Sequence, residues 1–357
     1  MEYKILVINP GSTSTKIAIF INEERILLKN VQHNTFELSK YPNSPDQLPL
    51  RRDDIIKVLD EKGYSLEDFD VFVGRGGGIK PCEAGVYLAE GKLIEHSGST
   101  LFVNHPAPLG SVLAHEFACK KNVPAFTVDP PDTDEFEPVA RITGLKNVER
   151  QSRFHALNQK EVARRVASQL GKTYKDINIV VAHLGGGISI GAHKKGRVID
   201  SSDVIRGEGP MTPTRAGALP AKCVLDLCYS GEYSEKEMYD LIGRNSGIID
   251  HLGTSDLRDV EKNMNDGDEY AKLVYDALIY QISKTIGAMS TVLFGDVDAI
   301  ALTGGISNSK YLVENVTKRV ESIAPVKVFP GEFEMEALVN GALRVLRGEE
   351  EVKVYKG

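Results

Sequence analysis

A row of hydroxyl groups and one lysine follows the first strand pattern of the sequence. Residues 5–8 are four consecutive apolar side chains, which predict a buried strand, and Pro10-Gly11 ends it. The residues after this break are hydrogen-bond donors and one cation: Ser12, Thr13, Ser14 and Lys16. Because the glycine lets backbone approach a ligand, this turn has the parts of a phosphate-binding site. It lacks the GxxxxGK[ST] spacing of a Walker loop, and a polar hairpin at a sheet edge is the alternative.

The same plan occurs a second time. Residues 179–193 again form an apolar run, a glycine turn and a second strand pattern, and each copy continues into a third short strand, at 25–28 and at 197–199. Asn9 and His183 occupy equivalent positions, so the offset is 183 − 9 = 174, close to half of the 357 residues. The repeat predicts two similar α/β halves whose glycine turns face one nucleotide across a cleft.

Three motifs together carry a resemblance to a known family: Asn9-x-Gly11-Ser12-x-Ser14-x-Lys16, His183-Leu184-Gly185-Gly186-Gly187 and Thr303-Gly304-Gly305-Ile306-Ser307. They look like the two phosphate turns and the adenosine turn of the actin-like ATPase superfamily. Within it, the chain resembles the acetate and butyrate kinase family nearly end to end. The resemblance implies two ribonuclease-H-like domains, ATP or ADP as nucleotide and Mg²⁺ as cofactor. The phosphate and nucleotide ligands that it implies are Ser12, Ser14, Lys16, His183, Gly185, Gly186, Gly187, Gly304, Gly305 and Ile306.

Two arginines lie in glycine-rich or proline-rich loops. Arg75 stands among glycines in 74–78, directly after the strand expected at 69–73, and the carboxyl ends of strands are where α/β sheets bind ligands. A flexible turn with a solvated arginine is the alternative. Arg215 ends the irregular stretch 206–217. The resemblance makes Arg75 and Arg215 the pair that neutralises the transferred phosphoryl group, and leaves the role of Arg206 open.

An aspartate and a histidine are the further catalytic candidates. Asp129 follows the strand expected at 125–128 and is fixed by two prolines, which favours metal binding or catalysis over packing. His155 precedes Asn158-x-x-Glu161, which has the form of a helix N-cap, so it is expected beside the positive end of a helix. A structural hydrogen-bonding histidine is the alternative. The Phe154-His155 pair also matches the family.

Acidic residues begin the helix expected at 337–346. The resemblance implies a magnesium-associated glutamate here, and the sequence allows Glu334 or Glu336, of which Glu336 is preferred. Asp129 is expected as a second magnesium contact, partly through water. An acidic first turn that merely complements the helix dipole is the alternative. The expected pocket for the acyl group contains Gly77, His105 and Phe154.

These residues suit a carboxylate as phosphoryl acceptor. A carboxylate is already ionised at neutral pH and needs no general base, only relief from repulsion between two anions. The expected reaction is reversible in-line transfer between ATP and butyrate, giving butyryl phosphate and ADP. Asn9 and Lys16 would hold phosphate, and His155 would bond the phosphoryl group or the acyl carbonyl.

The length of the acyl chain and the class of protein leave alternatives. The three glycines of 76–78 leave room for a chain longer than acetate, while isobutyrate, propionate and acetate remain alternatives. A sugar kinase using Asp129 as base and a non-catalytic actin-like ATPase module are rivals from other classes.

Composition bounds the remaining expectations. A length of 357 residues predicts two domains, placed at 1–170 with 340–357 and at 171–339. The net charge of −7 argues against a nucleic-acid partner, and no apolar run approaches the ~18 residues of a membrane span. No export leader is apparent, and four cysteines near apolar runs, without CxxC spacing, predict buried thiols in a reducing cytoplasm. The resemblance implies a homodimer or a larger homo-oligomer.

Overall fold

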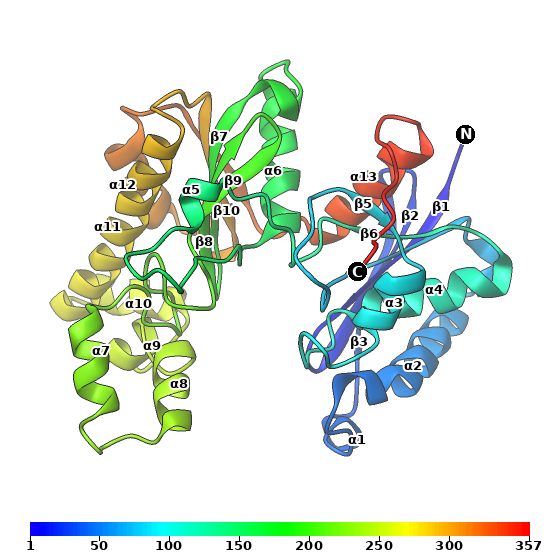
Figure 1. The fold of residues 1–357 in the computed structure, drawn as a ribbon, viewed down its shortest axis with the longest axis horizontal. Coiled ribbons are helices and arrows are strands. Elements are labelled where there is room, and N and C mark those ends of the chain that lie inside the picture. Colours follow the sequence, from blue (N-terminus) through cyan, green and yellow to red (C-terminus); the bar gives the residue numbers. More distant parts are fainter. The chain divides into compact units, whose positions relative to one another are not determined.

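The computed structural model describes residues 1–357 as two compact units (Figure 1). The first unit joins Met1–Asp134 to Phe333–Gly357, and the second is Glu135–Glu332. Each unit contains one sheet with helices packed against it. The two-domain α/β fold expected from the sequence is therefore present, with domain limits that differ from the predicted ones.

The first sheet has six strands in the order β3-β2-β1-β4-β6-β5. Its strands are β1 (Lys4–Pro10), β2 (Ser14–Ile21), β3 (Glu24–Gln32), β4 (Val71–Gly74), β5 (Val86–Leu88) and β6 (Ala125–Val128). β1, β2 and β3 pair antiparallel, while β4 and β6 continue parallel to β1. The apolar run of 5–8 is fully buried in β1, as its pattern predicts.

Helices on this sheet begin and end at residues that physical chemistry favours. They are α1 (Thr35–Leu38), α2 (Leu48–Glu61), α3 (Gly91–Ser97), α4 (Leu109–Lys121) and α13 (Glu334–Leu346), with short 3₁₀ turns η1 (Ser44–Gln47) and η2 (Leu66–Asp68). α2 begins at Leu48, and Pro49 fits its first turn. α4 ends at Asn122, which adopts a left-handed conformation with φ of 56°.

The second sheet repeats the strand order of the first. Its five strands run β11-β10-β7-β8-β9, which corresponds to β6-β4-β1-β2-β3. They are β7 (Asn178–Leu184), β8 (Ile188–Lys194), β9 (Arg197–Ser201), β10 (Ala299–Gly304) and β11 (Val326–Pro330). Strand directions also correspond, because β7–β8–β9 is antiparallel and β10 and β11 are parallel to β7. The duplication predicted from the glycine turns is therefore confirmed.

The helices of the second unit cover and extend this sheet. They are α5 (Pro138–Arg141), α6 (Ala156–Gln169), α7 (Ala221–Cys228), α8 (Glu235–Gly243), α9 (Ile248–Leu252), α10 (Leu257–Asn265), α11 (Glu269–Val292) and α12 (Lys310–Val320), with 3₁₀ turns η3 (Tyr174–Asp176) and η4 (Gly305–Asn308). α11 is a core helix, since Val274, Leu278, Ile282 and Ile286 are buried in it at helical spacing. The Ser234–Glu237 capping box of α8 is also formed.

Helix α6 lies between the two sheets along the chain and α13 lies after both, and their packing decides the domain limits. α6 follows the first sheet along the chain but packs on β7 and β10, and α13 follows the second sheet but packs on β6, β1 and β4. The prediction assigned residues up to 170 to the first domain and only 340–357 of the C-terminal segment. The first limit is wrong because α6, with Val162 and Val166 buried, packs in the second unit. The second limit is wrong because the whole of α13, from Glu334 on, packs in the first unit.

The cysteine prediction is wrong for three of four thiols. Cys119, Cys223 and Cys228 are exposed, and Cys82 is half-buried. For Cys223 and Cys228, apolar neighbours in sequence did not indicate burial, because α7 buries none of its residues. Cys119 lies in α4 but is not among the residues that this helix buries. No helix has the length and apolar character to cross a membrane.

The packing of α13 on the first sheet can be tested at Gly341. A methyl group at this position would lie 2.5 Å from Cγ1 of Val128 in β6. We expect Gly341→Ala to lower the free energy of unfolding by about 1–3 kcal/mol, because added volume in a packed core forces neighbours apart. Urea denaturation measures this change.

The matched control is Gly287→Ala in α11, where a methyl group would meet nothing within 4 Å. An alanine inside a helix stabilises by about 0.5–1 kcal/mol, so the control should unfold at equal or higher urea. Equal stability of the two variants would contradict the packing of α13.

Candidate functional site

The first glycine turn joins β1 to β2, and a buried arginine donates hydrogen bonds to its backbone. Gly11 donates its N–H to the carbonyl of Ser14 at 2.7 Å. Arg51 of α2 is fully buried and donates to the carbonyls of Ser12 (3.0 Å) and Ser14 (3.3 Å) and to Oγ1 of Thr15 (3.1 Å). Burial lowers the pKa of Arg51 to about 10. Sequence reasoning missed Arg51, because nothing near it in the chain marks a contact with this turn.

Two of the predicted phosphate contacts lie on one face of the first sheet. Asn9 and Lys16 are register partners across β1 and β2, so their side chains leave the same face. Lys16 is exposed, and Ser12 is exposed at the turn. This arrangement leaves a cation and hydroxyl donors accessible beside the glycine turn.

Asn9, Arg75 and Glu334 come together from three distant parts of the sequence. Oε2 of Glu334 accepts hydrogen bonds from Nδ2 of Asn9 (2.7 Å) and from Nη1 of Arg75 (3.0 Å). The same Nη1 also lies 3.3 Å from Oδ1 of Asn9. Adjacent parallel strands β1 and β4 carry Asn9 and lead to Arg75, and the first turn of α13 brings Glu334.

The preferred glutamate is not the one at this cluster. Glu336 pairs with Arg25 at 2.9 Å, and both side chains are partly exposed. A helix turns by about 100° per residue, so the side chains of Glu334 and Glu336 leave α13 in different directions. Glu334, the second choice from the sequence, is therefore the carboxylate beside Asn9 and Arg75.

Asp129 has a structural contact that its sequence position did not indicate. It is buried, adopts a positive φ of 38°, and accepts a hydrogen bond at Oδ1 from the N–H of Gly85 (2.8 Å). The N–H of Asp129 donates in turn to the carbonyl of Gly85. The residue thus joins the end of β6 to the start of β5. Strain of this kind persists where the surroundings fix a residue.

The glycines after Arg75 leave less room than the sequence suggested. A methyl group on Gly76 would lie 2.4 Å from Oγ1 of Thr127, and one on Gly78 would lie 3.1 Å from Val103. Only Gly77 has no neighbour closer than 3.5 Å. The room expected after Arg75 is therefore limited to Gly77, where a methyl group would already contact Pro131, Asp132 and Pro108 at 3.5–3.6 Å.

His105 lies in the loop before α4. Its Nδ1 accepts a hydrogen bond from the N–H of Ala107 at 3.1 Å. Partial burial of the ring, followed by the positive charges of Arg75 and Arg51, lowers the pKa of His105. A neutral imidazole is therefore kept in the electrostatic field of Arg75.

The second glycine turn brings Arg215 and His155 together. A methyl group on Gly187 would lie 2.6 Å from Nη1 of Arg215 and 3.4 Å from Cε1 of His155. Nη1 of Arg215 donates to the carbonyl of Val204 at 3.0 Å, and burial lowers the pKa of this guanidinium. The absence of a side chain at Gly187 is what allows the cation and the imidazole to approach the turn.

His155 and His183 are stacked, with ring centroids 3.8 Å apart and planes inclined by 14°. Nδ1 of His155 lies 2.7 Å from Oγ of Ser189, and Nδ1 of His183 lies 2.8 Å from Nδ2 of Asn158. His155 is itself the N-cap residue of α6. Its expected place at a helix N-terminus is therefore confirmed.

One neighbouring prediction fails at this helix. Asn158 does not cap α6, because the helix begins at Ala156 and the Asn158 amide bonds His183 and Thr303. Phe154 is buried against Ala156 and Val198. The apolar side chain of Phe154 fixes the start of α6 on the second sheet.

A cavity of about 790 Å³ opens beside the second glycine turn. Gly185 and Gly186 line it, together with Gly305 and Ile306 of the predicted adenosine turn. Its size is within the usual range of small-molecule sites. Gly304 lies behind the wall, since a methyl group there would meet the Leu184 carbonyl oxygen at 2.3 Å. Sequence reasoning missed four further charged lining residues, which are Asp256, Arg258, Glu261 and Glu332.

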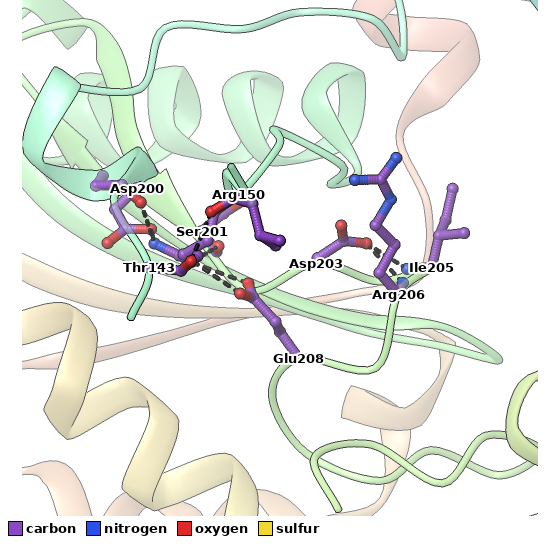
Figure 2. A network of polar contacts seen from close by, with 10 residues as sticks. Thr143, Arg150, Asp200, Ser201, Asp203, Ile205, Arg206 and Glu208 are labelled. Carbon is purple, nitrogen blue, oxygen red and sulfur yellow. Dashed lines mark hydrogen bonds and ion pairs between the residues drawn. The ribbon is translucent and has the colours of Figure 1, made fainter. Parts of the chain in front are cut away.

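A partly buried arginine organises the loop that leads to Arg215 (Figure 2). Arg150 donates to Asp200 (2.8 Å), to Glu208 (2.8 Å) and to the carbonyl of Ser201 (2.8 Å). Further along, Oδ1 of Asp203 accepts from the backbone N–H of Arg206, whose guanidinium points away from that carboxylate in Figure 2. The structure thus gives Arg206 a backbone contact in this loop.

A sequence model of the acetokinase family matches residues 140–330, more than half of the chain. The chain belongs to the acetokinase family. The matched segment includes His155, His183 and Arg215, whereas Asn9 and Arg75 lie outside it. Membership places the chain among kinases whose phosphoryl acceptor is a carboxylate.

Solved structures of three acyl kinases have the same fold. Acetate kinase from Porphyromonas gingivalis is 22% identical, with 96% of this chain and 100% of that chain covered and a TM-score of 0.75. Propionate kinase from Francisella tularensis is 19% identical, with 94% of this chain and 98% of that chain covered and a TM-score of 0.71. Acetate kinase from Entamoeba histolytica is 16% identical over 95% and 99%, with a TM-score of 0.75. At these identities the likeness concerns the fold.

Behind the stacked histidines lies a third, fully buried histidine. His193 of β8 contacts the Tyr174 hydroxyl through Nδ1 (2.7 Å) and Oε1 of Gln159 through Nε2 (3.0 Å). Burial, followed by the positive charges of Lys160 and Arg164, lowers the pKa of His193 well below its usual value. This imidazole is therefore neutral in the folded protein at pH 7.

The lowered pKa of His193 predicts a loss of stability in acid. In the unfolded chain the His193 imidazole takes up a proton near pH 6.5, whereas in the folded chain it stays neutral at this pH. The free energy of unfolding therefore falls as pH drops below about 6.5. One such group contributes a slope of at most about 1.4 kcal/mol per pH unit. We expect His193→Gln to have a smaller slope than wild type in urea denaturation between about pH 7.5 and 5.5.

His251→Gln serves as control, because the His251 side chain is at the surface and bonds Tyr270. Its slope should equal that of wild type. An unchanged slope in His193→Gln would show that His193 is not the neutral buried group described above.

Proposed function

We propose that this member of the acetokinase family is a butyrate kinase. It would transfer the terminal phosphoryl group reversibly between ATP and butyrate, giving butyryl phosphate and ADP. The observation that carries the proposal is the convergence of Arg215, His155 and the Gly187 turn beside a cavity of nucleotide size in the second unit. These groups are cations and hydrogen-bond donors, which is what transfer between two anions requires.

The proposed mechanism rests on charge neutralisation. A carboxylate acceptor is ionised at pH 7, so no residue has to remove a proton from it. Arg75 and Arg215 would spread positive charge over the oxygens of the transferred group. Glu334 and Asn9 hold one edge of the Arg75 guanidinium, which supports this role because it fixes the direction of the remaining donors. Lys16, Ser12 and Ser14 would contact phosphate at the first turn, and the Gly185–Gly187 turn at the second.

Glu334 is the residue best suited to hold Mg²⁺. Mg²⁺ is commonly bound by one or two carboxylates together with water and substrate phosphates. One carboxylate, already oriented by Asn9 and Arg75, fits that donor set. Asp129 is the weaker second contact, because its Oδ1 already holds Gly85. Bound Mg²⁺ would neutralise charge on the β- and γ-phosphates.

Butyrate is proposed as acceptor because Gly77 carries no side chain close to Arg75, and His105 would lie beside the acyl group. Acetate or propionate is the second candidate, favoured by the acetate and propionate kinases that share the fold. Isobutyrate is a branched alternative. The structural role of Asp129 supports none of the mechanisms in which a base activates a sugar hydroxyl. We also propose a cytoplasmic homodimer or larger homo-oligomer.

A panel of acids tests the substrate. The purified protein is incubated with ATP, Mg²⁺ and hydroxylamine, together with acetate, propionate, butyrate, isobutyrate or valerate, and the acyl hydroxamate is quantified. We expect the highest kcat/KM with butyrate. A maximum with acetate or propionate would replace butyrate by the second candidate. Hydrolysis of ATP without hydroxamate from any acid would favour a non-catalytic or sugar-directed ATPase.

Arg215 tests the mechanism. We expect Arg215→Ala to lower kcat about 10³-fold, the size of effect seen when an arginine that stabilises transferred phosphoryl charge is removed. Arg244→Ala is the matched control, because this arginine is exposed at the end of α8 and pairs with Asp240. Activity of Arg215→Ala close to that of the control would contradict the role of Arg215.

A further inference from the structure

Five polar side chains connect the core of the second unit to His155. They alternate between helix α6 with its flanking turn and strand β8: Tyr174, His193, Gln159, Ser189 and His155. The first four are buried, with exposures of 8%, 0%, 0% and 0%, and His155 at the end is partly exposed. Because buried hydrogen bonds have few alternative partners, the position of each proton in this chain can be deduced.

Gln159 fixes the inner half of the chain. Its Nε2 donates to the backbone carbonyl of Ser189 at 3.0 Å, and a carbonyl can only accept, so the amide has one orientation. Oε1 of Gln159 therefore faces Nε2 of His193 as an acceptor, and that nitrogen must carry the proton. Nδ1 of His193 is then an acceptor for the Tyr174 hydroxyl at 2.7 Å. The lowered pKa of His193 agrees with one proton on this ring.

Ser189 fixes the outer half. Its Oγ accepts from Nε2 of Gln159 (2.9 Å) and from the backbone N–H of His155 (3.2 Å), which uses both lone pairs. The single hydroxyl proton must then point to the remaining partner, Nδ1 of His155, at 2.7 Å. Nδ1 of His155 is thus an acceptor, and a neutral His155 ring carries its proton on Nε2.

The stacked partner ring reaches the same state through different residues. Thr303 donates its hydroxyl proton to the carbonyl of Gly331 (3.2 Å), so its Oγ1 accepts from Nδ2 of Asn158 (3.3 Å). The second proton of that amide nitrogen goes to Nδ1 of His183 at 2.8 Å. Both stacked rings therefore accept at Nδ1.

Gly191 keeps the space for the inner bond. A methyl group on this residue would lie 2.6 Å from Oε1 of Gln159 and 3.3 Å from Nε2 of His193. The glycine lies on β8 between Ser189 and His193, on the face that all three share. Any larger residue would separate Gln159 from His193.

We propose that Tyr174, His193, Gln159 and Ser189 are positioning residues whose hydrogen bonds all run in one direction and hold His155 as the Nε2–H tautomer. His155 then acts in the transfer as a hydrogen-bond donor and does not take up a proton from the substrate. The assignment of the tautomer rests on the contacts alone, and only its use in catalysis rests on the proposed function. A donor fits an acceptor that is already ionised.

The tautomer can be measured without any turnover. The full-length protein is labelled with ¹⁵N-histidine, and long-range ¹H–¹⁵N correlation separates protonated from unprotonated ring nitrogens in each of the eight histidines. The spectrum of His155→Gln identifies the His155 signals. We expect Nδ1 unprotonated and Nε2 protonated in the neutral ring. A proton on Nδ1 would overturn the proposal and leave the proposed kinase activity untouched.

Ser189→Ala tests the connection. We expect kcat to fall about 10- to 100-fold, the usual effect of losing the partner that orients a functional histidine, with KM for ATP nearly unchanged. The His155 signals should change to a mixture of tautomers. Ser290→Ala is the matched control, because its buried hydroxyl donates within α11 and belongs to no part of this chain of bonds.

Gly191→Ala provides a second variant, in which none of the five hydrogen-bonded side chains is itself replaced. It should also produce mixed tautomers at His155 and a lower kcat, because it separates Gln159 from His193. A single Nε2–H tautomer together with control-level kcat in both Ser189→Ala and Gly191→Ala would show that these residues do not hold the tautomer, and the proposal would be wrong.

Discussion

The packing of one helix end against one strand end is the constraint on which the candidate site depends. In the second unit the first turn of α6 lies on β7 and β8, where Asn158 bonds His183 and Gln159 bonds Ser189. This contact sets the stacking of the two histidines, and Gly187 admits Arg215 beside them. A buried polar network of this kind stabilises only one arrangement, because any unpaired member would remain desolvated.

The first unit uses the same arrangement with different chemistry. Asn9 and His183 lie near the ends of equivalent strands, and each forms a hydrogen bond with the first turn of a helix. Asn9 bonds Glu334 of α13 at 2.7 Å, and His183 bonds Asn158 of α6 at 2.8 Å. In each case the helix comes from the other half of the sequence. The duplicated fold thus places a charged pair in one unit and a neutral ring in the other. Because α13 packs on the first sheet, the first unit is incomplete without a distant segment of the chain, whereas the second unit is the continuous segment Glu135–Glu332.

The arginines near the glycine turns are stabilised in two different ways, one by a carboxylate and the others by carbonyl oxygens. Arg75 shares its charge with Glu334, both partly exposed, so its desolvation is small. Arg51 and Arg215 are more buried, and burial lowers the pKa of each, yet carbonyl oxygens satisfy their donors. Arginine tolerates this because its guanidinium stays protonated far above neutral pH. The protein can thus keep cations beside glycine turns without pairing every one with a carboxylate.

Local patterns in the sequence determined the strands, the glycine turns and the place of His155 at the N-terminus of α6, because apolar runs and glycine breaks depend only on near neighbours along the chain. The duplication followed from finding the same local pattern twice, at an offset of 174. They also brought Asn9, Arg75 and Arg215 forward as candidates. Only the tertiary structure decided between Glu334 and Glu336. It also showed that Phe154 is buried, that Arg51 contacts the first glycine turn, and that hydrogen bonds connect Tyr174 to His155. Those outcomes depend on which helix packs on which sheet. That choice comes from contacts between segments far apart in sequence, which a local pattern does not contain.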